Sequence, residues 1–297
     1  MRNERRKSGS GRGGEKPVAE RRHGACRLLL HVTVFRDDLE EPASVEELEA
    51  LSNKKRRAKL EAIRNACRAY ITGPLNEFLA AQLADVTAGA GRVEIDEAVA
   101  DGQTLLLWYP EVEPRDRAYV RPAIRLESGA KSALDPHAPL TITPYVAGEV
   151  AGVDLGVPDV TTIEATRTFW DKVVIAHGLR RWYERRGELR QEGQRVSRHY
   201  YDLHCLMQSD TGRAAVADRD LGADCVRHAR MFFDRPDYDL SSAVPGTFAI
   251  EPVPKRVDAL ARDYDNTTAM IFGAAPSFDD IRLGRTDRAG NQHTPLV

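Results

Sequence analysis

Two polar clusters in the second half of the chain contain residues that could do chemistry. Thr168-Phe169-Trp170-Asp171-Lys172 places Lys172 beside an apolar helical stripe, and Ser197-Arg198-His199-Tyr200-Tyr201-Asp202-Leu203 places Arg198 and Asp202 four residues apart. A lysine or arginine can bind an anionic ligand, and an aspartate or histidine can accept a proton. Taken separately, the lysine is typical of a surface side chain, and the Arg198–Asp202 spacing is typical of an exposed ion pair.

The sequence excludes several other chemistries. It contains no Gly-x-Ser-x-Gly motif, no P-loop, no Gly-x-Gly-x-x-Gly after a strand and no His-Glu-x-x-His. His199 and His204 lie five residues apart, on different faces of a helix, which argues against a shared metal ion. Four cysteines without Cys-x-x-Cys spacing argue against a disulfide framework or a zinc site and favour a reducing cytoplasm. These are Cys26, Cys67, Cys205 and Cys225.

The predicted elements give an α+β fold, with a sheet in the N-terminal half and helices in the C-terminal half. Period-two alternation and β-branched residues predict strands over His31–Phe35, Arg92–Ile95, Thr104–Tyr109, Tyr119–Glu127 and Thr141–Val146. Beyond Pro158 the pattern is helical. It predicts helices near Glu164–Arg186, Arg195–Gln208, Leu221–Phe233 and Pro254–Ile271, so both polar clusters lie on helices.

Helices are also predicted after the first strand. Ser44 and Glu47 form a capping box that opens a short helix. A longer helix begins near Ser52, and Gly73-Pro74 is expected to break it before a further helix. Its first two turns carry five cations, Lys54, Lys55, Arg56, Arg57 and Lys59. Cations at a helix N-terminus oppose the macrodipole, so either an anionic partner or a solvated face would explain them.

Composition sets the remaining limits. Apolar residues make up 42% and charged residues 30% of the 297 residues, which is typical of a globular protein. The formal net charge of −2 gives no global attraction to nucleic acid, and no apolar run is long enough to span a membrane. The basic, Gly/Ser-rich stretch from Met1 to Arg22 cannot pack a core, and Arg285–Val297 is typical of a polar tail.

Taken together, the two polar clusters resemble the C-terminal half of the AbiEii/AbiGii nucleotidyltransferase toxins, including the MenT-like members of that family. The resemblance rests on the two clusters in this order, preceded by Val157-Pro158. It extends to Val32-Thr33-Val34-Phe35-Arg36-Asp37-Asp38-Leu39, to the basic helix from Ser52 and to Arg121-Pro122-Ala123-Ile124-Arg125-Leu126-Glu127. It thus covers about residues 32 to 280.

This resemblance implies a toxin that transfers a nucleotide from an NTP, with magnesium, to the 3′ end of tRNA and is opposed by a cognate antitoxin. Lys172 would hold triphosphate charge, with Arg198 and His199 beside it at the nucleotide. Asp202 would orient that lysine or accept a proton from the attacking hydroxyl. Glu127, on the charged face of its strand, is the candidate third catalytic carboxylate, and the five cations of the basic helix are candidate RNA-binding residues.

The chain departs from this family at the metal site. Family members carry a Gly-Gly-Ser/Thr loop and an Asp-x-Asp before the segment that begins at Val32, whereas the corresponding positions here are Leu29-Leu30-His31. These residues cannot replace the oxygen ligands that Mg²⁺ prefers. Asp37 and Asp38 are weak substitutes, because adjacent side chains on a strand point to opposite faces. We therefore expect residues 1–31 to be a disordered or aberrant basic segment, and a shifted reading frame or a wrong start would explain the second case.

Two alternatives to an active transferase remain open at this stage. One is a non-catalytic remnant that still binds RNA, nucleotide or an antitoxin. The other is an α+β interaction protein in which Arg198 and Asp202 form a surface pair. In each case we expect a sheet domain over residues 32–158, a helical domain over residues 159–284 and a polar tail over residues 285–297.

Overall fold

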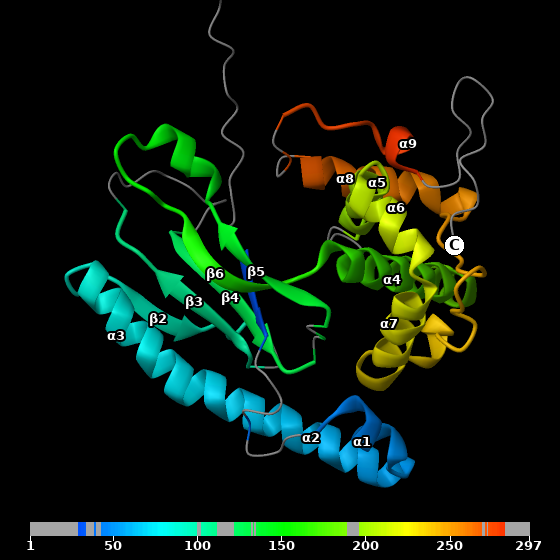
Figure 1. The fold of residues 1–297 in the computed structure, drawn as a ribbon, viewed down its shortest axis with the longest axis horizontal. Helices are drawn as coiled ribbons and strands as arrows, with labels where there is room; N and C mark the ends of the chain where they lie inside the picture. The colour runs from blue at the N-terminus through cyan, green and yellow to red at the C-terminus, as the bar shows by residue number, and fades with distance from the viewer. Residues whose placement is uncertain are drawn as a thin grey trace, which may run out of the picture.

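A computed structural model describes residues 29–33, 39, 43–99, 102–111, 122–131, 133, 135–188, 196–268, 271 and 273–282. The fold is α+β, as the sequence predicted, with the strands in the N-terminal half and a group of helices in the C-terminal half (Figure 1). Residues 1–28, Val34–Asp38, Tyr119–Arg121 and the predicted tail lie outside the described residues. None of the described helices is long and apolar enough to cross a membrane.

A four-stranded mixed sheet lies in the N-terminal half, with the strand order β1-β4-β3-β2. Its strands are β1 (Leu29–Thr33), β2 (Arg92–Ile95), β3 (Thr104–Trp108) and β4 (Ala123–Gly129). β1 is parallel to β4, and the other neighbouring pairs are antiparallel. β1 begins at Leu29, so the sheet includes three residues that the sequence assigned to the aberrant segment 1–31. In this register His31 lies opposite Glu127.

A separate antiparallel hairpin consists of β5 (His137–Ile142) and β6 (Val157–Ile163). The prediction of a strand over Thr141–Val146 was displaced, because β5 ends at Ile142 and a 3₁₀ turn, η3, occupies Tyr145–Glu149. The prediction that only helices follow Pro158 was also wrong, since that residue lies inside β6. The β-branched residues that end β6 favour an extended backbone, and pairing with β5 satisfies their backbone hydrogen bonds.

The N-terminal helices are α1 (Val45–Ala50), α2 (Asn53–Tyr70) and α3 (Asn76–Val86). The predicted capping box is confirmed: Ser44 N–H donates to Glu47 Oε2 at 2.8 Å, and Glu47 N–H donates to Ser44 Oγ at 3.1 Å. The predicted break at Gly73-Pro74 was wrong. A π-helical turn, η2 (Ile71–Leu75), joins α2 to α3, because its wider spacing accommodates a proline that lacks an N–H.

The helical half contains α4 (Ala165–Arg186), α5 (Arg198–Met207), α6 (Asp210–Ala217), α7 (Arg219–Phe232), α8 (Val257–Thr268) and α9 (Phe278–Ile281). α4 is the central helix and packs against α5, α6 and α7 (Figure 1). The sequence predicted α4, α5, α7 and α8 within a few residues at each end, but it missed the short helices α6 and α9.

Buried apolar residues form two clusters. The larger cluster surrounds α4, where Phe169, Trp170 and Val173 are almost completely buried. The smaller cluster lies between α2 and the mixed sheet. Met231 and Phe232, at the end of α7, pack against this smaller cluster, so α7 connects the two halves of the molecule.

Candidate functional site

Three of the predicted site residues meet between α4 and α5. The ammonium nitrogen Nζ of Lys172 lies 2.6 Å from Oδ2 of Asp202. The same nitrogen lies 3.3 Å from Nδ1 of His199. The side chains of Lys172 and Asp202 are 21% and 37% exposed, so a ligand from solvent can reach both. The structure therefore joins two clusters that are 27 residues apart in the chain into one site.

Buried side chains fix the two helices that carry this site. Trp170, two residues before Lys172, is fully buried, and its indole N–H donates to the carbonyl oxygen of Ala215 at 2.9 Å. On α5, Tyr200 and Leu203 are fully buried in the same core. The direction in which a polar side chain points from a helix depends on where its residue lies relative to the buried face. Core packing thus determines where Lys172 points.

His199 is a neutral hydrogen-bonding group in this site. Desolvation by burial, and then the charges of Lys172 and Arg198, lower the pKa of His199 to about 3. Because an ammonium group can only donate, Nδ1 of His199 must accept the hydrogen bond from Lys172. The single ring proton of the neutral imidazole is therefore on Nε2. His199 can donate that proton in a hydrogen bond to a ligand oxygen.

Arg198 is not paired with Asp202, although their spacing predicted an exposed ion pair. Asp202 binds Lys172 instead, and Arg198 makes no ion pair with any residue in the described part of the chain. The Nε atom of Arg198 is buried and has no hydrogen-bond partner among the described residues. A buried, unsatisfied donor on a cation is unfavourable, and an anionic ligand would relieve it.

Glu127 lies on the mixed sheet and not in the α4–α5 site. On β4, Nη1 of Arg125 lies 3.1 Å from Oε1 of Glu127, and Nε of Arg125 lies 3.3 Å from Oδ2 of Asp96. Arg125 therefore bridges two carboxylates on this sheet. The structure does place Glu127 directly beside β1, the strand on which the family's metal-binding aspartates are expected.

The described residues do not fit a magnesium site. Among them, no group of three or more His, Cys, Asp or Glu side chains is arranged to hold a metal ion. Glu127 and Asp96 are bound by Arg125, and Asp202 is bound by Lys172. Mg²⁺ requires a near-octahedral set of oxygen ligands, which one lysine-bound carboxylate does not provide. The alternative carboxylates Asp37 and Asp38 lie outside the described residues.

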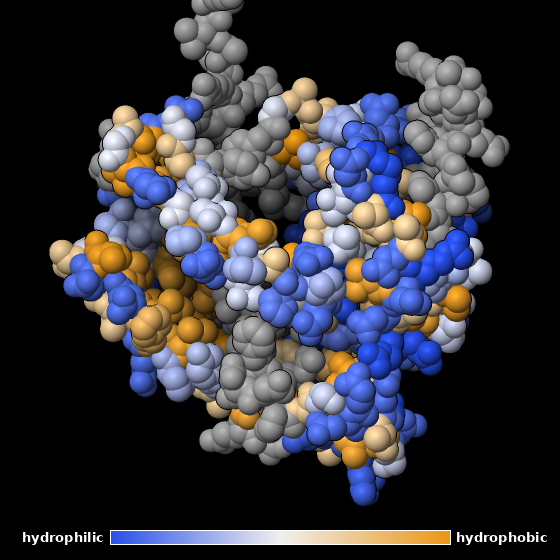
Figure 2. All heavy atoms as spheres, in the orientation of Figure 1, coloured by the Kyte–Doolittle hydropathy of each residue, from blue (hydrophilic) through white to orange (hydrophobic). Residues whose placement is uncertain are grey.

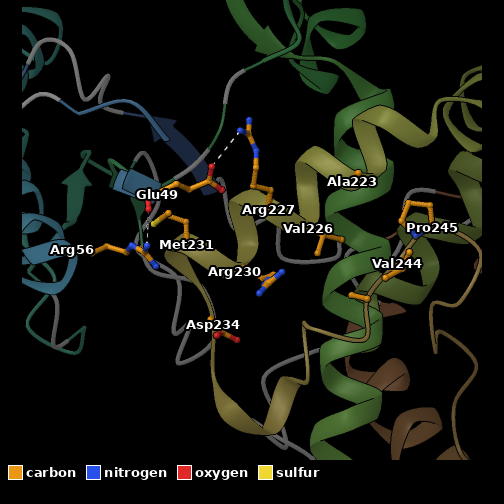
Figure 3. A pocket seen from close by; sticks show the side chains of 11 residues that line it. Glu49, Arg56, Ala223, Val226, Arg227, Arg230, Met231, Asp234, Val244 and Pro245 are labelled. Carbon is orange, nitrogen blue, oxygen red and sulfur yellow. Dashed lines mark hydrogen bonds and ion pairs between the residues drawn. The ribbon is translucent and has the colours of Figure 1, made fainter. Parts of the chain in front are cut away.

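The cations at the start of α2 have different environments. The guanidinium of Arg56 donates to the carbonyl oxygens of Leu48, Glu49 and Leu51 at 2.9, 3.0 and 3.1 Å. Figure 3 shows Arg56 beside Glu49. Arg56 thus satisfies carbonyls at the C-terminal end of α1, where the helix dipole favours a cation. This contact offsets the unfavourable position of Arg56 at the N-terminus of α2. Three other cations, Lys54, Lys55 and Arg57, are exposed, and Lys59 is half-buried.

An open cleft of about 620 Å³ lies between this region and α7. Arg227 borders it and is held by Glu46 and Asp224, with Nη1 3.1 Å and Nη2 2.7 Å from their carboxylate oxygens. Arg230 also borders the cleft and makes no ion pair with a described residue (Figure 3). The cleft is therefore distinct from the α4–α5 site and shares no lining residue with it.

Arg167 is a buried residue beside the site that sequence analysis missed. Its Nη1 donates to Oδ2 of Asp224 at 2.6 Å and to the carbonyl oxygen of Asp135 at 2.8 Å. Its Nε lies 3.7 Å from Oδ1 of Asp171, the residue before Lys172. Burial raises the pKa of Asp171, although the charge of Arg167 opposes that shift. The four-residue spacing of Arg167 and Asp171 was the available sequence signal.

Comparison with known proteins agrees with the resemblance in the sequence. The family model described as "Nucleotidyl transferase AbiEii toxin, Type IV TA system" matches residues 44–282 of the 297-residue chain. No curated protein and no solved structure gives a significant match. The family match includes both polar clusters and the helices that join them. The chain therefore belongs to the AbiEii nucleotidyltransferase toxin family of type IV toxin–antitoxin systems.

Proposed function

We propose that this protein transfers a nucleotide from an NTP to the 3′ end of tRNA and that the α4–α5 site binds the triphosphate. The observation that carries the proposal is the contact of Lys172 with Asp202 and His199 in a nucleotidyltransferase family member. Beside this contact lies Arg198, whose Nε has no partner among the described residues. Two cations next to one carboxylate leave an excess positive charge, which suits a polyphosphate.

The hydrogen-bonding capacity of Lys172 supports this role. An ammonium group has three N–H donors, and Asp202 and His199 can each receive one of them. These two hydrogen bonds fix the direction of the third N–H group, which can bind a phosphate oxygen. Arg198 adds a second cation, and the Nε2–H of His199 adds a neutral donor. We assign Lys172, Arg198 and His199 to nucleotide binding.

Asp202 has a role in the transfer itself. The acceptor hydroxyl oxygen forms a bond to the α-phosphorus while the bond to pyrophosphate breaks, and the hydroxyl proton must leave. The carboxylate oxygen of Asp202 that does not face Lys172 can accept this proton. Asp202 also holds Lys172 in place. Glu127 remains our candidate for a third catalytic carboxylate. In that role it would have to release Arg125 and bind another group.

The exposed cations of α2 are our candidates for RNA binding. Lys54, Lys55 and Arg57 are exposed and can contact backbone phosphates without breaking a bond to a described residue, whereas Arg56 is bound to the end of α1. Lys59 is half-buried and would contribute less. A cognate antitoxin, which the family implies, would be the protein partner in the cytoplasm.

The test is incubation of the purified chain with total tRNA, Mg²⁺ and each radiolabelled NTP in turn, followed by gel analysis. The proposal expects labelled tRNA, and the label should fall by at least about a hundredfold in Lys172→Ala and Asp202→Ala. Lys255→Ala is the matched control, because Lys255 is an exposed lysine elsewhere in the helical half. Its activity should equal that of the wild type.

A binding measurement separates transfer from binding alone. Titration of the wild type and Lys172→Ala with each NTP should show at least about tenfold weaker binding in the variant. Binding that depends on Lys172 without any transfer would identify a non-catalytic remnant. Equal binding by both proteins would contradict the phosphate role of Lys172 itself.

A further inference from the structure

The β5–β6 hairpin and its connecting segment, residues 137–163, expose an unusual concentration of apolar side chains. Six of the fourteen exposed large apolar residues in the described part of the chain lie between residues 140 and 157. They are Leu140 (50%), Ile142 (44%), Val146 (53%), Val150 (39%), Val153 (56%) and Val157 (56%). Hydrophobic residues are visible over η3 at the upper left of the molecule (Figure 2). A concentration of this kind marks an interaction site more often than isolated exposed residues do.

The strand register places several of these residues on one face. Leu140 pairs with Val160, and Ile142 pairs with Val157 across the hairpin. Residues directly opposite each other in an antiparallel pair project to the same side, and so do residues two apart on one strand. The register shifts between these two pairs, because β6 has an extra residue there and Asp159 has a positive φ of 57°. Leu140 and Ile142 are two apart on β5, so Leu140, Ile142 and Val157 lie on one face and form an apolar strip. Val146 on η3, and Val150 and Val153 after it, lie between the two strands in the sequence and are also exposed.

The charged residues of this segment have a single sign. Residues 132–166 contain no lysine or arginine but five carboxylates, whereas the whole chain has a net charge of only −2. All five are on exposed residues: Asp135, Glu149, Asp154, Asp159 and Glu164. An apolar surface on a segment whose only charged side chains are carboxylates attracts cationic groups and disfavours the phosphates of RNA.

We propose that residues 137–163 form a docking surface for a partner protein that presents a segment in which apolar and basic side chains alternate. The apolar side chains would cover the strip, and lysine or arginine side chains would pair with the surrounding carboxylates. This surface is separate from the basic start of α2, which we assign to RNA. The proposal does not depend on nucleotide transfer, because it concerns a different surface and a different class of ligand.

Fluorescence anisotropy with short labelled peptides tests this proposal on the full chain. We would compare a peptide of alternating lysine and leucine with a lysine–serine and a glutamate–leucine peptide of equal length. The lysine–leucine peptide should bind at least about tenfold more tightly than either control peptide, because only it supplies both components. Equal binding of the lysine–serine peptide would overturn the apolar part of the proposal.

Two variants locate the binding. Ile142→Ser/Val157→Ser removes apolar surface, and Glu149→Gln/Asp154→Asn removes charge; each should weaken lysine–leucine binding by at least about tenfold. The control is Phe78→Ser/Val86→Ser, which changes two exposed apolar residues of α3 and should leave binding unchanged. Because all these positions are exposed, the Tm of each variant should stay close to that of the wild type.

Other occupants of the surface would give different results. Unchanged peptide binding in both hairpin variants would overturn the proposal. So would a labelled RNA oligonucleotide that binds the wild type and is lost in Ile142→Ser/Val157→Ser. A wild-type dimer in sedimentation that the same variant converts to a monomer would assign the strip to a second copy of this chain.

Discussion

The carboxylate of Asp263 accepts a hydrogen bond from the backbone N–H of Ser197, with Oδ2 and N 2.8 Å apart. Both residues are buried. Ser197 immediately precedes α5, so Asp263 on α8 satisfies a backbone donor at the start of the helix that carries His199 and Asp202. A carboxylate at a helix N-terminus also interacts favourably with the helix dipole. α8 thereby fixes the first turn of α5.

We predict that Asp263→Ala lowers the free energy of unfolding by about 2–3 kcal/mol, because a buried N–H loses a charged acceptor. Asp263→Asn keeps an oxygen acceptor and should cost about 1 kcal/mol. Urea unfolding measures both values. Asp265→Asn, on an exposed residue of the same helix, is the matched control and should have almost no effect. Equal stability of Asp263→Ala and Asp265→Asn would show that the Ser197 contact contributes little.

His199 should make stability depend on pH. Its pKa in the folded protein is about 3, below the value of 6.5 for a free side chain. Between these values the unfolded chain binds a proton that the folded chain does not bind. The stability that neutral His199 contributes is therefore complete above about pH 6.5 and is lost as the pH falls toward 3.

Urea unfolding between about pH 4.5 and 7 should show this effect as a difference in slope. The wild type should lose stability on acidification more steeply than His199→Gln, by up to about 1.4 kcal/mol per pH unit. Histidine NMR signals give an independent measurement, in which the imidazole signal that is absent from His199→Gln should be that of a neutral ring at about pH 5. Parallel stability curves for the two proteins would contradict the neutral state of His199.

The sequence predicted much of this site because its signals were local. A helical apolar pattern located α4 and α5, and the two motifs identified Lys172, His199 and Asp202. The four-residue spacing suggested Arg198 as the partner of Asp202. The actual partner, Lys172, lies on another helix, so sequence spacing could not identify it. β6 was missed for a similar reason. Its strand conformation depends on pairing with β5, which is a contact between separate parts of the chain.

The two arginines at the start of α2 should respond differently to substitution. Arg56→Ala removes hydrogen bonds to two carbonyl oxygens of α1 and to that of its C-cap residue, and should lower stability by about 1–3 kcal/mol. Arg57→Ala changes an exposed side chain and should alter stability by less than about 0.5 kcal/mol. Urea unfolding of the two variants measures this contrast.

For RNA binding we expect the opposite order, in which Arg57→Ala has a larger effect than Arg56→Ala. If Arg57 contacts a phosphate, Arg57→Ala should weaken tRNA binding and reduce the dependence of log K on log salt by about one unit. Filter binding at several salt concentrations measures that slope. An unchanged slope in the triple variant Lys54→Ala/Lys55→Ala/Arg57→Ala would remove α2 from the RNA interface.

Arg167 should be among the most sensitive positions in the helical half. Its buried guanidinium binds Asp224 and the carbonyl oxygen of Asp135 and lies close to Asp171. Arg167→Met removes this cation, while Asp224 keeps Arg227 as a partner, and should lower the free energy of unfolding by about 2–3 kcal/mol in urea unfolding. Arg213→Met is the control, because Arg213 forms an exposed ion pair with Asp210 and should cost less than about 1 kcal/mol.

The double variant Arg167→Met/Asp224→Asn distinguishes an electrostatic role from a packing role. If the cost of Arg167→Met arises from uncompensated carboxylates, neutralising Asp224 should recover part of the lost stability. If the cost arises from lost packing of the arginine side chain, the losses of stability caused by Arg167→Met and Asp224→Asn should add. Because Asp171 precedes Lys172, loss of Arg167 should also weaken NTP binding in Arg167→Met. If the role is electrostatic, the double variant should recover NTP affinity together with stability. Full NTP affinity in a destabilised Arg167→Met would show that Arg167 supports the fold without positioning Lys172.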